Sequence, residues 1–287
     1  VIVSRSEDGY VTVVAPIEDT PGEKAGLKTN DKIIKVDDKD IVGIDLEEAV
    51  ALMKGKKGTK VTLTVMRDNV REPKIFEITR EEIILKTVKS NMMENSIGYS
   101  RITMFDEDTG SEFKKALKEL TSQNMKGLIL DLRQNPGGFI NQCVDVADEL
   151  LDEGLVVYTE DKAKTREDYK SGKDKLEVHF VVLIDEGSAS ASEIISGAIK
   201  DRKAGLLIGV KTFGKGLVQS IEQLKDGSGI KLTTQKYYTP NGISINKIGI
   251  QPDIEVKALE AEEGQNPEDV KDVQLERAVA ELLKQIK

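Results

Sequence analysis

The clearest hydrophobic pattern in this chain lies between residues 178 and 219. The run from His179 to Ile184 is almost wholly apolar and has the length of a buried strand, and turn-forming residues 185 to 187 follow it. Apolar residues then recur at the spacing of a helix, at Ile194, Ile195, Ala198 and Ile199. Gly205 to Val210 is apolar again, so the segment predicts the order strand, helix, strand of an α/β layer.

Residues 1 to 80 show shorter apolar or alternating runs, separated by turn signals. They predict strands at Val1–Val3, Val11–Val14, Ile33–Val36 and Val61–Met66. Two short helices are expected between them, Thr20–Gly26 with a proline at its first turn and Asp45–Met53 with one apolar face. This pattern indicates a small β-rich domain.

Residues 81 to 287 are expected to form a second, larger domain. Further strands are predicted at Ile83–Leu85, Ile97–Thr103, Gly127–Leu132, Val218–Leu224 and Ile230–Tyr238. An amphipathic helix is predicted from Asp269 to Ile286. The whole pattern favours an α+β fold in which an α/β core is preceded by the β-rich domain.

The amino-acid composition disfavours or excludes several classes of protein and of functional site. A net charge of −9 argues against a nucleic-acid-binding protein, which normally presents a basic surface. No apolar run approaches the length of a membrane span, and the start VIVSRSEDGY lacks the layout of a signal peptide, so any signal or anchor is expected to precede Val1. A single cysteine, Cys143, excludes an internal disulfide and a CxxC metal site, and its apolar surroundings favour a buried structural thiol.

Ser190 lies where the predicted strand gives way to the predicted helix. Its hydroxyl would face backbone N–H groups at the positive end of the helix, which is a suitable place for a developing oxyanion. A serine needs a base to take its proton, and this chain has only one histidine. Lys215, between two glycines, is a candidate because burial in an apolar pocket lowers a lysine pKa. Gln219 follows four residues later.

Plainer interpretations of these residues remain open. Ser190 and Glu193 fit the serine-x-x-glutamate capping box, which needs no catalytic role. Lys215 could be a solvated loop lysine. His179, the remaining candidate base, lies at the start of its strand and away from Ser190, which favours a structural role.

Two adjacent glycines, Gly137 and Gly138, follow the predicted strand Gly127–Leu132 in the phrase LILDLRQNPGG. Glycines leave main-chain N–H groups accessible, and such groups can stabilise the oxyanion of an acyl-transfer reaction. The alternative is an ordinary tight turn between a strand and a helix.

Several of these phrases resemble one family, the C-terminal processing peptidases or tail-specific proteases. GSASASEI is followed by TFGKG, with the lysine 25 positions after the serine, and LILDLRQNPGG and TPNGISINKIGIQPDIEV also resemble the family, with the CtpA/CtpB type most similar. The resemblance implies that Ser190 is the nucleophile, Lys215 the general base and Gln219 the residue that orients the lysine. It also implies an oxyanion hole formed by the Ala191 N–H with that of Gly137 or Gly138.

The first 80 residues resemble the PDZ domain of the same family, through PIEDTPGEKAGLKTNDKIIKVDDKDI and VTLTVMRD. PDZ domains bind an extended peptide C-terminus as an added strand. The resemblance suggests Val3, Val50 and Met53 as groove residues, although their spacing is equally that of core residues. The family's carboxylate-binding loop would precede Val1, so it is expected to be missing from this sequence.

The resemblance therefore implies a serine endopeptidase with a crotonase/ClpP-like core, which cleaves protein substrates near their C-termini. It also implies a PDZ domain that recognises the C-terminus of a protein or peptide substrate and gates activity. It implies no metal and no organic cofactor, no nucleic-acid partner, and an extracytoplasmic location; a homodimer is left open. The alternatives are a non-catalytic PDZ-type peptide-binding protein and a relative that binds acyl thioesters.

Overall fold

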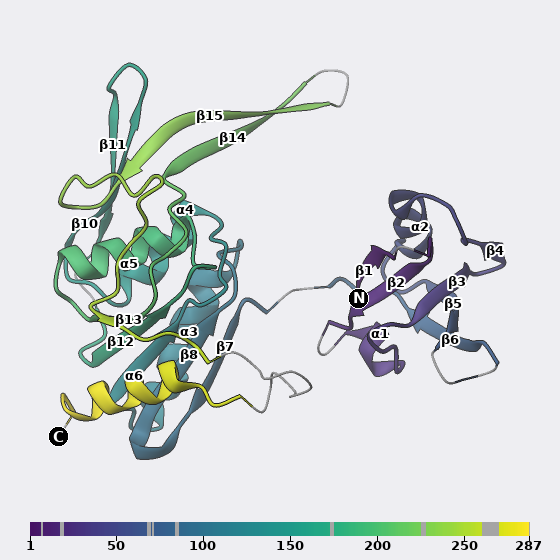
Figure 1. Cartoon of the computed structure of the whole chain (residues 1–287), viewed down its shortest axis with the longest axis horizontal. Coiled ribbons are helices and arrows are strands. Elements are labelled where there is room, and N and C mark those ends of the chain that lie inside the picture. Colours follow the sequence, from purple (N-terminus) through teal and green to yellow (C-terminus); the bar gives the residue numbers. More distant parts are fainter. Residues whose placement is uncertain are drawn as a thin grey trace. The chain divides into compact units, whose positions relative to one another are not determined.

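The computed structural model forms two compact units, Val1–Leu85 and Lys86–Lys287 (Figure 1). It describes the whole chain except residues 7, 18–19, 68–69, 71, 84–85, 173–174, 225–227, 260–269 and 287, and the side chains of residues 220, 221 and 231. The sequence predicted a division near residue 80, and the structure divides the chain five residues later.

In the part of the first unit that the structure describes, a small antiparallel sheet is accompanied by two helices. Its elements are β1 Ile2–Arg5, β2 Val11–Ala15, α1 Pro21–Lys24, β3 Lys32–Val36, β4 Lys39–Asp40, α2 Leu46–Met53, β5 Lys60–Met66 and β6 Lys74–Thr79. The strand order is β1-β2-β3-β5-β6, with β4 paired to β3. Alternate residues of β2 and β5 point into one apolar core, as the period of a half-buried strand requires.

The second unit contains a six-stranded sheet and four α-helices among its described residues. Its elements are β7 Val88–Met92, η1 Glu94–Ser96, β8 Ile97–Ile102, α3 Thr109–Ser122, β9 Gly127–Asp131, α4 Ile140–Asp148, β10 Gly154–Asp161, β11 Arg166–Ser171, β12 His179–Ile184, α5 Ala191–Asp201, β13 Leu206–Gly209, β14 Leu217–Gln223, β15 Gly229–Tyr238, β16 Ile254–Glu255 and α6 Val273–Leu283. The sheet order is β16-β13-β12-β9-β8-β7, and all neighbours are parallel except β7 and β8.

Both faces of this sheet are covered. Helices α3, α4 and α5 pack with Leu128, Leu130 and Val182 on one face, whereas α6 packs with Ile129 and Val181 on the other. Residues of β9 and β12 are therefore buried on both sides, which explains why these strands are continuously apolar rather than alternating.

A second sheet of the larger unit is antiparallel, with the order β11-β10-β15-β14. Its hairpins β10–β11 and β14–β15 extend from the core as long arms (Figure 1). β14 begins two residues after Lys215, so this sheet is a direct continuation of the loop that carries the candidate base.

The predicted mixed α/β organisation is confirmed. The strand predicted at His179–Ile184 is β12 with the same bounds, and the helix predicted after Ser190 is α5. The strand predicted at Ile83–Leu85 falls partly on residues outside the described part of the chain, as does Asp269, the predicted start of the last helix. Strand β7 was not predicted, because its five residues VKSNM are largely polar.

Two classes of feature are absent from the described residues. Their helices are all too short or too polar to cross a membrane. They also contain no group of three or more histidine, cysteine, aspartate or glutamate side chains placed to hold a metal ion.

A partly buried ionic network fastens α6 to the sheet. The Arg133 guanidinium donates to Asp131, at the end of β9, over 2.6 and 3.0 Å, and to Asp272, the N-cap of α6, over 2.8 and 2.9 Å. The Tyr99 hydroxyl donates to the same Asp131 carboxylate over 2.7 Å. The Asp131 side chain is fully buried, so its charge depends on these partners.

Replacing Arg133 with methionine should lower the free energy of unfolding by about 3 kcal/mol, because it leaves the buried Asp131 carboxylate without its cation. Urea denaturation at neutral pH measures this loss. The control is Arg277→Met, which removes a more exposed ion pair on α6 and should cost less than about 1 kcal/mol.

The part of this loss that comes from the Arg133–Asp272 ion pair should shrink in acid. Burial by itself would raise the pKa of Asp272. Hydrogen bonding to Arg133 outweighs burial and holds this pKa below its usual value. A carboxyl group with a lowered pKa stabilises the fold above its unfolded pKa, near about pH 4, and this stabilisation disappears as the pH falls through the folded value. An Arg133→Met effect that is equally large at strongly acid and neutral pH would contradict the assignment.

Candidate active site

Ser190 lies in a strained turn between β12 and α5. Its backbone angles are φ 55° and ψ −114°, in a region that residues other than glycine seldom adopt. Its N–H donates to the Glu193 carboxylate over 3.0 Å, which helps to hold this conformation. The Ser190 side chain is half-buried at the first turn of α5, and among the described residues no acceptor is bonded to the adjacent Ala191 N–H.

The Glu193 carboxylate joins the serine turn to the lysine loop. One oxygen accepts from the Ser190 N–H and from the Lys215 N–H, the latter over 2.8 Å. The other accepts from the Thr212 hydroxyl over 2.6 Å and from the Gly214 N–H over 2.7 Å. Glu193 is fully buried, so its four hydrogen bonds replace the water that an exposed carboxylate would have.

Gly137 approaches the serine turn more closely than any other residue type could. Its φ is 99°, and a Cβ placed on it would lie 2.7 Å from the Ser190 Cβ and 2.9 Å from the Ala191 nitrogen. Both the conformation and the space therefore require glycine. The Gly137 N–H donates to the Asn135 side chain over 2.9 Å, whereas no acceptor is bonded to the Gly138 N–H within the described part of the chain.

Asn135 holds this loop in place, although no pattern in the sequence had marked it as a functional residue. Its side chain donates to the Ile102 carbonyl over 2.8 Å, while its own carbonyl accepts from the Ala189 N–H and the Ser192 hydroxyl. The residue is fully buried. Its position in the sequence, between the end of a core strand and Pro136, could have marked it as a supporting residue. A polar side chain at such a position is often buried, and a buried amide needs fixed hydrogen-bond partners.

The neighbouring serines differ from Ser190. Ser188 donates its hydroxyl to the Leu132 carbonyl over 2.8 Å, and Ser192 donates to the Asn135 carbonyl over 3.0 Å. Both side chains are fully buried. Their hydroxyls are therefore engaged in holding loops, and Ser190 is the one of the three that is accessible.

Lys215 and Gln219 both have exposed side chains. Among the described side chains, no hydrogen bond joins the Lys215 amine to Ser190 or to Gln219. The expectation that the lysine lies in a dry pocket is wrong for this structure, because Glu193 fixes only the Lys215 backbone and leaves the side chain to solvent. Gln219 follows an irregularity in the β14–β15 pairing, and its role in orienting the lysine stays a prediction.

Cys143 and His179 have no place in the chemistry of this turn. The Cys143 thiol is fully buried and donates to the Ala191 carbonyl over 3.1 Å, and burial raises the pKa of the Cys143 thiol above its usual range. His179 begins β12, and Ser190 follows the other end of that six-residue strand, roughly 17 Å along it.

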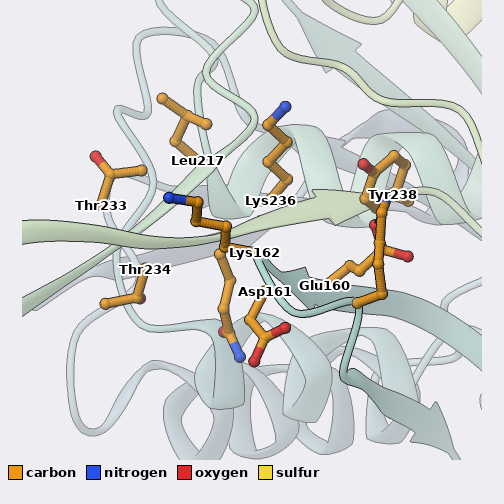
Figure 2. Close-up of a pocket in the computed structure, with 10 residues that line it drawn as sticks. Glu160, Asp161, Lys162, Leu217, Thr233, Thr234, Lys236 and Tyr238 are labelled. Atoms are coloured by element: carbon orange, nitrogen blue, oxygen red, sulfur yellow. The ribbon is translucent and has the colours of Figure 1, made fainter.

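A pocket near this region has a different lining. It lies on the sheet formed by β10, β14 and β15 (Figure 2), and Glu160, Lys162, Lys236 and Tyr238 are among its lining residues. Leu217, at the start of β14, also lines it, but Ser190 and Lys215 do not. The pocket therefore lies beside the candidate active site without including it.

The predicted groove residues of the first unit lie on β1 and α2. Val3 is half-buried on β1, which is the edge strand of its sheet, and Val50 and Met53 are half-buried on α2. Val3 and Met53 also pack against the core of the unit. A free edge beside a helix is the arrangement that strand addition uses, so the groove stays a prediction that this geometry permits.

Two family models match the chain. Residues 96–256 match peptidase family S41, and residues 12–67 match the PDZ domain. A peptidase domain and a PDZ domain are thus combined in one chain. Because the first match covers more than half of its residues, the chain belongs to peptidase family S41.

Individual relatives agree with this assignment. The chain is 44% identical over 258 residues to the carboxy-terminal-processing protease of Bartonella bacilliformis, covering 88% of this chain and 59% of that protein. It is 42% identical over 255 residues to the carboxy-terminal processing protease CtpA of Bacillus subtilis, covering 88% and 54%. The chain therefore spans little more than half the length of these two relatives.

A solved structure, the photosystem II D1 C-terminal processing protease, matches with a TM-score of 0.56 and 32% identity over 89% of this chain and 71% of that one. A putative S41 protease from Bacteroides fragilis covers the whole chain and 82% of its own, with a TM-score of 0.62 at 16% identity, which supports the fold alone.

Glu193→Gln should destabilise the larger unit by about 3 kcal/mol, because the amide group turns two acceptor positions into donors that face N–H and O–H groups. Thermal or urea unfolding measures the loss. Glu186→Gln, an exposed neighbour in the same turn, is the control and should stay within about 0.5 kcal/mol of the original protein. Equal stability of the two variants would show that Glu193 does not hold the loops together.

Proposed function

We propose that this protein is a serine endopeptidase of the C-terminal processing type, with Ser190 as nucleophile and Lys215 as general base. The observation that carries the proposal is the Ser190 turn, where the one accessible hydroxyl of the GSASASEI segment is held in a strained conformation beside unpartnered N–H groups. Membership of peptidase family S41 supports it independently.

In the proposed reaction, the neutral Lys215 amine takes the proton of the Ser190 hydroxyl as the serine oxygen attacks the carbonyl carbon of a peptide bond. The protonated amine then gives that proton to the leaving nitrogen, and the peptide bond breaks to leave an acyl group on Ser190. Water, deprotonated by the same lysine, hydrolyses this ester. The exposed Lys215 side chain must turn towards Ser190 for this sequence, and Gln219 is assigned to orient it.

The oxyanion hole is assigned to the N–H groups of Ala191 and Gly138. Support comes from hydrogen bonding, because the Gly137 N–H already donates to Asn135 whereas those of Ala191 and Gly138 have no acceptor among the described residues. Gly137 contributes differently, since its missing side chain lets the loop approach the serine turn. Donors that are held in place before the reaction stabilise the developing charge most effectively.

Cleavage of an unstructured protein such as casein tests the assignment. Ser190→Ala and Lys215→Ala should each lower the rate by at least about 1,000-fold, since the hydroxyl and its base act as a unit. Lys211→Ala removes an exposed lysine of the same segment and should leave the rate unchanged. Equal cleavage by all four proteins would dismiss the Ser-Lys mechanism.

Both alternatives predict that casein is not cleaved, and further measurements separate them from each other. A non-catalytic PDZ-type binding protein would cleave nothing, although it would still bind peptides. A protein that acts on acyl thioesters through its oxyanion N–H groups would keep its activity on thioesters in the Lys215→Ala variant. Family membership favours the peptidase over both.

The PDZ domain is assigned to recognise the C-terminus of a protein or peptide substrate. A free peptide ending in an apolar residue should add to the edge of β1, with its last side chain near Val50 and Met53. Val50→Asp should weaken binding about tenfold, measured by fluorescence anisotropy. Val42→Asp, on an exposed loop of the same unit, is the control. Equal binding by Val50→Asp and the original protein would contradict the groove assignment.

The extracytoplasmic location and the homodimer stay predictions.

A further inference from the structure

Tyr237, near the end of β15, has a buried hydroxyl with no hydrogen-bond partner among the described residues. Only 1% of the residue is exposed. Burying a hydroxyl without a partner is unfavourable, and such groups in folded proteins usually have an explanation. Phenylalanine would fill the same space without this cost, so the hydroxyl calls for a function.

The position of Tyr237 indicates a function for this hydroxyl. Its backbone N–H donates over 3.3 Å to the carbonyl of Gly216, the residue after Lys215. Its side chain belongs to the same apolar cluster as Ala191 and Ile194 of α5. The Tyr237 backbone is therefore bonded to the loop of the candidate base, and its side chain lies in the core that also contains the first residue of the helix after the nucleophile.

The protonation state of the phenol also matters. Burial raises the pKa of the Tyr237 phenol above its usual range, and the nearby Ser190 side chain opposes this rise. The phenol thus keeps its proton throughout the pH range in which a peptidase works. It is available as a hydrogen-bond donor and not as a base.

We propose that Tyr237 is a positioning residue for Ser190, whose O–H donates to the serine oxygen when that oxygen turns towards substrate. This inference rests on the proposed role of Ser190. A serine hydroxyl has one proton and two lone pairs. When the Tyr237 O–H donates to one lone pair of the Ser190 oxygen, the single serine proton is directed towards Lys215. The same hydrogen bond stabilises the negative charge that grows on the serine oxygen as that proton leaves. Tyr237 itself neither gains nor loses a proton.

Tyr238 offers a matched control. It is the next residue of the strand, so its side chain lies on the opposite face of the sheet. There it stacks on Tyr158 and lines the pocket that excludes Ser190 (Figure 2). Tyr238→Phe therefore removes the same single oxygen atom as Tyr237→Phe, but at a position away from Ser190.

The experiment compares the original protein with Tyr237→Phe, Tyr238→Phe and Ser190→Ala. A fluorophosphonate probe, which reacts with activated serines, gives the rate at which Ser190 is labelled, and casein cleavage gives kcat and KM. Tyr237→Phe should lower the labelling rate and kcat by about 10- to 100-fold with KM unchanged, because a hydrogen bond to a developing charge is lost. Its melting temperature should stay the same or rise. Tyr238→Phe should match the original protein.

The outcomes separate this inference from the proposed function. Labelling at Ser190 without any casein cleavage would remove the endopeptidase assignment, while the labelling rates would still test Tyr237. Equal labelling of Tyr237→Phe and the original protein would overturn the inference, as would a slower rate accompanied by a lower melting temperature, which indicates a structural role. Absence of labelling in the original protein would overturn both.

Discussion

The candidate site depends on one buried carboxylate, that of Glu193. Its oxygens accept hydrogen bonds from the serine turn and from the loop of Lys215, which is 22 positions further along the chain. A fully buried carboxylate loses its water, so each of these donors is needed to compensate. If the two loops separated, the Glu193 carboxylate would lose the hydrogen bonds from one of them. The Glu193 carboxylate thus keeps the backbones of the proposed nucleophile and base at a constant separation.

The parallel sheet brings the other parts together. The loops after β9, β12 and β13 carry Gly137, Ser190 and Lys215, and the carboxyl ends of adjacent parallel strands lie at one edge of a sheet. The loops after β9 and β12 are then joined by hydrogen bonds from the Ser188 hydroxyl to the Leu132 carbonyl and from the Ser192 hydroxyl to the Asn135 carbonyl. The site is therefore assembled by sheet topology and fixed by buried polar residues that do no chemistry themselves.

The backbone and the side chains of the site are determined to different degrees. The Ser190 turn is tightly held, and the glycine contact at Gly137 leaves no room for another side chain. The Lys215 backbone is held as well, but its side chain is exposed. A long exposed side chain has many accessible rotamers, so the fold fixes the Lys215 backbone without fixing the position of its amine.

Local sequence determined the elements that carry the chemistry. An apolar run and a helical repeat predict β12 and α5, and the glycines and the serine-to-lysine spacing pointed to the residues of the candidate site. Only the tertiary structure decided that Ser190 is accessible while Ser188 and Ser192 are buried, that Asn135 supports the loop, and that Lys215 is exposed. The physical reason is that periodicity reports which face of an element is apolar, whereas accessibility and hydrogen-bond partners depend on segments distant in the chain.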